Sequence, residues 1–116
     1  MMTERDHKGL HILLDMHSCG STLVPGGFME KLSSIAGLTL VSEVEHKFPG
    51  GGATGIGLLS QSHASYHTWP EKGYVAFDLF SCRQLDNEEV SKVVAFVLKS
   101  FGSHIENSRF TCIGRE

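Results

Sequence analysis

Several sequence features are absent or scarce in this chain of 116 residues, and each absence narrows what the protein can do. No run of about 18 apolar residues occurs, and the first eight residues are too polar for a secretory signal, so we expect a cytoplasmic protein. Lysine and arginine do not cluster and the formal net charge is −3, which argues against nucleic acid or a membrane surface as a partner. The cysteines are odd in number and widely spaced, which predicts free thiols at Cys19, Cys82 and Cys112.

The hydrophobic residues, 41% of the chain, are enough for one core, so we expect a single domain over residues 1–116. A short apolar run bounded by turn residues predicts a strand over 10–16. Apolar residues at helical spacing, followed by Gly37, predict a helix over 27–36. From 38 to 48 the apolar residues Leu38, Leu40, Val44 and Phe48 have even numbers, and the charged residues Glu43, Glu45 and Lys47 have odd numbers, which predicts a long strand with one solvent-exposed face.

The second half of the chain predicts further strands and one helix. The glycines at 50–52 complete neither phosphate-binding pattern, so we interpret this segment as a turn or as backbone that approaches a ligand closely. Beyond it, the pattern predicts strands over 55–59, 64–67, 74–81 and 109–113. A valine-rich stripe from Val90 to Phe101 predicts a helix that is opened by Asp86-x-x-Glu89 as a capping box and closed by Gly102.

The predicted order, β-α-β-β-β-β-α-β, is typical of an α+β fold. We expect a two-layer sandwich, in which a mainly antiparallel β-sheet carries the two helices on one face. The other face of the sheet then needs a cover if it is apolar, and a dimer would provide one.

Most residues with plausible chemistry lie between positions 61 and 82. Zinc binding by His63, His67 and Cys82 is disfavoured, because two histidines four residues apart share a face on a helix and this region is rich in β-formers. A serine hydrolase is disfavoured because Ser62 lacks the flanking glycines of a nucleophile elbow. A Cys82–His67 thiol protease stays open at this stage, because sequence alone does not show whether the two residues meet.

One long motif runs through this region. It consists of Ser60-Gln61-Ser62-His63, then His67-Thr68-Trp69-Pro70-Glu71, Gly73-Tyr74 and Phe77-Asp78-Leu79-Phe80-Ser81-Cys82. The motif resembles the processing region of the small prokaryotic S-adenosylmethionine decarboxylase proenzymes. The resemblance also takes in Gly9-x-His11 to Asp15, Cys19 and the loop from Phe48 to Gly55, so that it covers nearly the whole chain.

The resemblance implies that the chain cuts itself between Gln61 and Ser62. The Ser62 hydroxyl would attack the preceding carbonyl, and β-elimination from the resulting ester would leave a β chain of residues 1–61 and an α chain of residues 62–116. Ser62 would then be a covalent pyruvoyl group, which forms a Schiff base with a substrate amine and accepts the electrons released with CO₂. No metal or separately bound cofactor is implied.

Other roles follow from the resemblance residue by residue. His67 would transfer a proton during processing, with support from the hydroxyl of Thr54, and Cys82 would return a proton to the carbanion. Phe48 and Trp69 would contact the substrate, and core packing is the less favoured alternative for both. Glu71 would hydrogen-bond the ribose. The implied substrate is S-adenosylmethionine, the product serves spermidine biosynthesis, and the implied assembly is a homodimer of αβ units with its active sites near the interface.

Several departures from the family pattern leave alternatives open. Gln61 stands where the family has glutamate, and Ala64 and Tyr66 replace branched aliphatic residues. Ser62 and His67 are an odd number of residues apart, so a bend or bulge is needed if they are to cooperate. The alternatives are a pyruvoyl-dependent decarboxylase of ornithine or arginine, and an unprocessed homologue that only binds a ligand. For Cys19 and Cys112 we expect a packing role.

Overall fold

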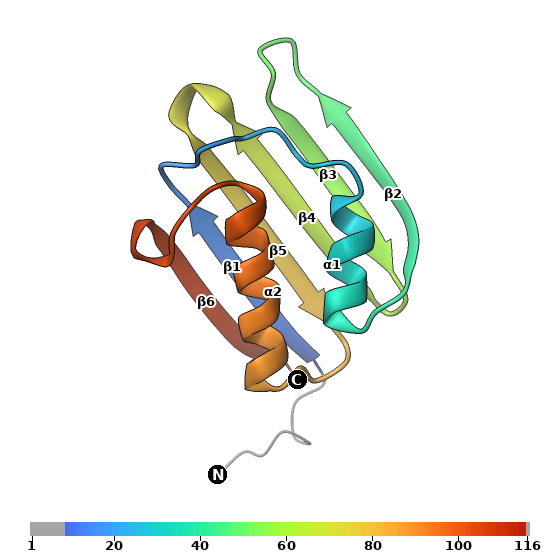
Figure 1. The fold of residues 1–116 in the computed structure, drawn as a ribbon. Coiled ribbons are helices and arrows are strands. Elements are labelled where there is room, and N and C mark those ends of the chain that lie inside the picture. Colours follow the sequence, from blue (N-terminus) through green and yellow to red (C-terminus); the bar gives the residue numbers. More distant parts are fainter. Residues whose placement is uncertain (1–8, 116) are drawn as a thin grey trace.

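The computed structural model describes residues 9–115, which form a six-stranded antiparallel sheet with two helices on one face (Figure 1). The order of elements along the chain is the predicted one, and the α+β prediction is confirmed. The elements are β1 (Gly9–Met16), α1 (Phe28–Ala36), β2 (Leu40–Lys47), β3 (Ala53–Leu59), β4 (Ser62–Trp69), β5 (Tyr74–Ser81), α2 (Asn87–Ser100) and β6 (Ser108–Arg115), with short 3-10 turns at Pro70–Lys72 and Ile105–Asn107.

The sheet has the strand order β2-β3-β4-β5-β1-β6, and every neighbouring pair is antiparallel. Side chains alternate along the central strands between the face that the helices cover and the face that they leave open. On the covered face, the core is built from fully buried residues such as Ile12, Leu14, Leu79, Leu32 and Val97. The first helix and the second helix also pack against each other over this face.

The ends of both helices have the predicted signals. Asp86 accepts a hydrogen bond from the backbone N–H of Glu89, and the Glu89 carboxylate accepts one from the N–H of Asp86, which completes the capping box of α2. Gly37 ends α1 at φ 68°, in the left-handed region that glycine adopts most easily. The Arg83 guanidinium then joins the helices, because it donates to the carbonyl of Ala36 at 2.6 Å and pairs with Glu89 at 2.6 Å.

Strand β2 departs from its predicted burial. The alternation predicted one wet face and one buried face, but every residue of β2 after Leu40 is exposed. A bulge between Leu40 and Ser42 reverses the parity, so that Val44 lies on the open face opposite Ile56 and is 68% exposed. The prediction was wrong because β2 is an edge strand beyond the reach of the helices, and because the bulge cannot be read from apolar alternation.

The open face of the sheet carries both apolar and polar side chains. Its exposed apolar residues include Val44, Ile56, Leu58 and Ile113. Among the described residues all three cysteines are free thiols, as predicted; Cys19 packs against the core, whereas Cys112 is exposed on β6 and is not the packing residue we expected. No helix in the described part of the chain is long and apolar enough to cross a membrane.

Candidate active site

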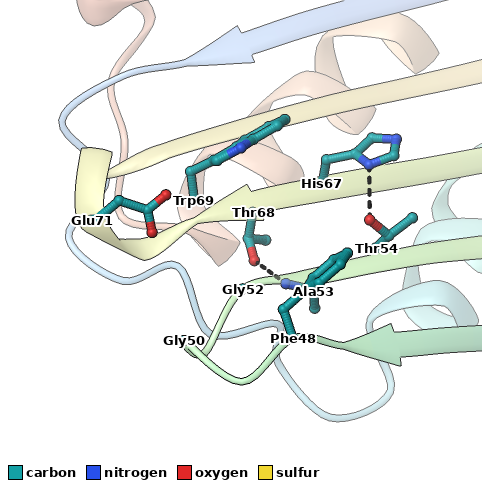
Figure 2. Close-up of a pocket in the computed structure, with 9 residues that line it drawn as sticks. All are labelled: Phe48, Gly50, Gly52, Ala53, Thr54, His67, Thr68, Trp69 and Glu71. Atoms are coloured by element: carbon teal, nitrogen blue, oxygen red, sulfur yellow. Dashed lines mark hydrogen bonds between the residues drawn. The ribbon is translucent and has the colours of Figure 1, made fainter.

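A cavity of about 370 Å³ lies at one end of β3 and β4, against the loop that joins β2 to β3 (Figure 2). Five of the site residues predicted from the sequence line it, although they come from different elements. The residues around the cavity are Phe48, Gly50, Gly52, Ala53, Thr54, His67, Thr68, Trp69 and Glu71.

The glycine loop is a tight turn that brings backbone close to β4. The N–H of Phe48 donates to the carbonyl of Gly52 at 2.8 Å, and Gly51 has φ 96°, a conformation that favours glycine. A side chain at Gly52 would begin only 2.7 Å from the Thr68 carbonyl oxygen. The hydroxyl of Thr68 accepts a hydrogen bond from the N–H of Ala53 at 2.9 Å and so fixes the loop to β4. Residues 50–52 therefore form a turn, one of the two interpretations given above, and this turn packs closely against β4.

Thr54 and His67 form a hydrogen-bonded pair on the open face of the sheet. They lie directly opposite each other in the register of β3 and β4, and the Thr54 hydroxyl is 3.0 Å from Nδ1 of His67. Figure 2 shows both side chains on the same side of the two strands. A hydroxyl that fixes one imidazole nitrogen leaves the other free for proton transfer, and this is the chemistry predicted for the pair.

Trp69 forms the aromatic wall of the cavity. It is the last residue of β4, and its ring lies 6.1 Å from the ring of His67 and 5.1 Å from the ring of Tyr74, centroid to centroid. Phe48 lies across the cavity and is 49% exposed, and Glu71 is exposed on the turn that follows Trp69. Neither Phe48 nor Trp69 is in the buried core, so core packing does not account for these two aromatic residues.

Ser62 and Cys82 lie at the opposite end of β4 and β5. Ser62 is the first residue of β4 and is buried, and its Oγ accepts a hydrogen bond from the backbone N–H of Cys82 at 3.1 Å. The turn before it contains Gln61 at φ 60°, a left-handed conformation that is strained for a residue with a side chain. The peptide bond predicted to be cut therefore joins a strained residue, Gln61, to Ser62, whose hydroxyl already accepts a hydrogen bond.

The two groups of predicted residues do not meet within one chain. Five residue steps along a strand separate Ser62 from His67, which corresponds to roughly 16 Å. Strand β4 pairs without irregularity from Ser62 to Trp69, so the bend or bulge considered above is absent and the two side chains point to opposite faces. Cys82 lies beyond the end of β5, farther still from His67, so a thiol-protease pair does not form within one chain.

The open face also holds polar contacts for which no role was predicted. Nε2 of His11 is 2.7 Å from a carboxylate oxygen of Asp78, and Ser65 donates to the other oxygen of Asp78. The hydroxyl of Tyr74 donates to Asp15 at 3.0 Å. Burial and the Asp15 carboxylate raise the pKa of the Tyr74 phenol, so that it stays a hydrogen-bond donor. Asp78 could have indicated these contacts in the sequence, because a carboxylate within the apolar run 75–80 needs hydrogen-bond partners.

Comparison with known proteins identifies the family of this chain. The model of the family described as S-adenosylmethionine decarboxylase matches residues 10–110. The chain is 35% identical over 88 residues to a protein of Methanococcus aeolicus named S-adenosylmethionine decarboxylase proenzyme, a match that covers 72% of this chain and 75% of that one. A protein of the same name from Persephonella marina is 38% identical over 96 residues, covering 78% of this chain and 71% of the other.

Two further matches extend the comparison. A protein with that name from Prochlorococcus marinus is 42% identical over 79 residues, and the match spans only 65% of its length. Among solved structures, the crystal structure of the adenosylmethionine decarboxylase from Aquifex aeolicus superposes with a TM-score of 0.75 at 26% identity, covering 94% of this chain and 91% of that one.

Proposed function

This chain belongs to the S-adenosylmethionine decarboxylase family, and we propose that it is a self-processing, pyruvoyl-dependent enzyme that decarboxylates S-adenosylmethionine. The observation that carries the proposal is the single cavity that Thr54, His67 and Trp69 line together with Phe48 and Glu71. The product is an aminopropyl donor for spermidine biosynthesis, and the enzyme acts in the cytoplasm.

The first step is cleavage of the chain's own backbone. The Ser62 hydroxyl attacks the Gln61 carbonyl and displaces the Ser62 nitrogen, which forms an ester. β-Elimination then separates a β chain of residues 1–61, ending in a carboxylate, from an α chain of residues 62–116 that begins with dehydroalanine. Water hydrolyses the imine tautomer of this residue to the pyruvoyl ketone and releases ammonia. Two observations support this step: the Cys82 N–H donates to Ser62 Oγ, and Gln61 is held at φ 60°. Cleavage releases the strain of that turn, which costs about 1 kcal/mol or more in a residue with a side chain.

The pyruvoyl group left on Ser62 supplies a ketone that binds the substrate amine and accepts the electrons released with CO₂. The remaining chemistry belongs to side chains of the protein. His67, with its Nδ1 held by Thr54, moves the proton during elimination, and Cys82 donates a proton to the substrate carbon after CO₂ has left.

The cavity accounts for recognition of the substrate. Phe48 and Trp69 present flat aromatic surfaces suited to an adenine ring and to a sulfonium cation. The Glu71 carboxylate is exposed beside them and can accept hydrogen bonds from ribose hydroxyls. The basic amino acids ornithine and arginine have no ring to occupy this aromatic cavity.

The active enzyme is a homodimer of αβ units, and this is also a proposal. The support is the separation of roughly 16 Å between Ser62 and His67 along one strand, so that residues expected to share one site meet only when they come from two chains. A two-fold axis across the open face would bring the Ser62 end of one chain to the cavity of the other. The exposed apolar residues Val44, Ile56 and Leu58 on the open face would then be covered.

The experiment that tests the function measures CO₂ released from carboxyl-labelled S-adenosylmethionine, ornithine and arginine by the processed protein. We expect release from S-adenosylmethionine alone, and loss of most of it in Glu71→Gln through a higher KM. Release from ornithine or arginine instead would overturn the substrate assignment. No release from any of the three by fully cleaved protein would overturn the enzymatic proposal.

Mixing subunits tests the shared site. Ser62→Ala chains keep the cavity but have no pyruvoyl group, whereas Trp69→Ala chains keep the pyruvoyl group but lack the aromatic wall. Refolding the two inactive proteins together is expected to restore up to about a quarter of the wild-type activity, because half of the chains form mixed dimers with one intact site each. No recovery, with mixed dimers demonstrated by mass, would show that each site lies within one chain.

A further inference from the structure

We propose that Tyr74 is a positioning residue that sets the orientation of Trp69 and thereby the affinity of the cavity for its substrate. Only the expected change in KM rests on the proposed function. The contact between Tyr74 and Trp69 is part of the structure itself.

Tyr74 and Trp69 are cross-strand partners at the ends of β5 and β4. Their ring centroids are 5.1 Å apart with an angle of 33° between the planes, so that the phenol ring packs against the indole in a tilted contact. Pro70, which follows Trp69, turns the chain away from the sheet, and Trp69 is only partly buried. The indole therefore depends on Tyr74 for much of its restraint.

Tyr74 is itself held from two directions. Its hydroxyl donates to a carboxylate oxygen of Asp15 at 3.0 Å, and its ring stacks on His17 with centroids 4.9 Å apart and an angle of 27°. Strand β5 lies between β4 and β1, so His17 and Trp69 approach Tyr74 from opposite sides. The result is a row of rings, His17–Tyr74–Trp69, that is anchored through Asp15 and ends at the cavity wall.

This row matters for binding because an aromatic wall recognises a flat ligand only when its ring is already oriented. An indole free to rotate must be ordered on binding, and ordering a side chain weakens affinity. Removing the Tyr74 hydroxyl frees the phenol ring and leaves the half-buried Asp15 carboxylate without its donor. The effect reaches the substrate through Trp69 and does not touch the reacting atoms.

The chain offers a matched control and a built-in probe. It contains two tyrosines and one tryptophan. Tyr66 also donates its hydroxyl to a carboxylate, that of Glu45, but it lies on the helix-covered face, away from the cavity. Any change in tryptophan emission reports on Trp69 alone, so Tyr74→Phe can be compared directly with Tyr66→Phe.

The experiment measures Trp69 emission, its quenching by acrylamide, the rate of self-cleavage and the steady-state constants for both variants. For Tyr74→Phe we expect altered emission, greater quenching and a KM raised about three- to tenfold, as expected for the loss of one hydrogen bond. The kcat should stay within about twofold and self-cleavage should be unchanged. Asp15→Asn, whose amide oxygen still accepts the bond, should restore most of the affinity relative to Asp15→Ala, and Tyr66→Phe should leave emission and KM unchanged.

Two results would overturn the inference. One is Tyr74→Phe with wild-type emission, quenching and KM. The other is a fall in kcat with no change in KM, which would mean a general disturbance of the site. If the wild-type protein decarboxylates nothing, the proposed function fails, but the emission and quenching of Trp69 still decide whether Tyr74 positions the indole.

Discussion

Adding one methyl group at Gly55 tests how β3 and β4 are held together beneath the Thr54–His67 pair. Gly55 lies directly opposite Tyr66 in the register of the two strands. A Cβ at Gly55 would lie 2.6 Å from Cε2 of the Tyr66 ring, and closer still to Cζ and the hydroxyl oxygen. Tyr66 cannot simply swing aside, because its ring packs edge-to-face on Phe28 and its hydroxyl donates to Glu45.

The overlap is large enough to give a measurable loss of stability. Overpacking of a buried site by one methyl group costs about 1–3 kcal/mol, and the contact at Gly55 is severe, so we expect Gly55→Ala to lower the free energy of unfolding by about 2–3 kcal/mol. In a domain of this size that corresponds to a fall in Tm of about 10 °C. Thr54 is the neighbour of Gly55 in β3, so a shift of the backbone at Gly55 also disturbs the Thr54–His67 hydrogen bond on the open face. Self-cleavage should therefore slow as well.

The sign of the effect should reverse when the ring is removed. In a Tyr66→Ile background the same Gly55→Ala change should stabilise by about 0.5 kcal/mol, because alanine restricts the unfolded chain and no longer meets a ring. Urea denaturation of the four proteins, each carrying Ser62→Ala so that all chains stay intact, measures the coupling. Equal destabilisation by Gly55→Ala in both backgrounds would refute the reasoning.

Three other predictions address the site and its surroundings. Thr54→Val removes the partner of His67 Nδ1 and should slow self-cleavage about tenfold, whereas Thr54→Ser should leave the rate near that of wild type; a time course on gels would tell the two apart. Gln61→Gly relieves the left-handed conformation and should stabilise uncleavable chains by about 0.5–1 kcal/mol in urea, and a loss of stability would contradict the strain. Hydrogen bonds from Arg83 and then from the Asp86 N–H lower the pKa of Glu89, so this contribution to stability is present above the ordinary glutamate pKa and is lost as the pH falls through the lowered value. The stability difference between wild type and Glu89→Gln should therefore shrink between about pH 6 and pH 3, and a constant difference would argue against the pair.

The fold was predictable because local signals and the global pattern agree. The capping box at Asp86, the glycines that end both helices and the short turns between strands each specify an element, and together they allow few arrangements other than an antiparallel sheet under two helices. The exposure of Val44 was not predictable, because one bulged residue moves a whole strand segment to the other face without altering its composition.

The site was predictable only in part. The aromatic, acidic and imidazole residues of the cavity were named from the motif, and they do surround one space. The odd spacing of Ser62 and His67 already indicated opposite faces of a regular strand. What the sequence did not reveal is that β4 has no bulge, so that the two residues stay on opposite faces and roughly 16 Å apart. The row from His17 to Trp69 was not predictable either, because ring contacts join residues of β4 and β5 to the residue that follows β1.

The most direct test of the central claim is an intact mass of the purified protein under denaturing conditions, with Ser62→Ala measured alongside. We expect two fragments, residues 1–61 and residues 62–116, with the second lighter by one ammonia than hydrolysis alone would leave it, and a single chain of 12.7 kDa minus one oxygen for the variant. A single uncleaved wild-type chain after long incubation would contradict self-processing, and the protein would then be a ligand-binding member of its family.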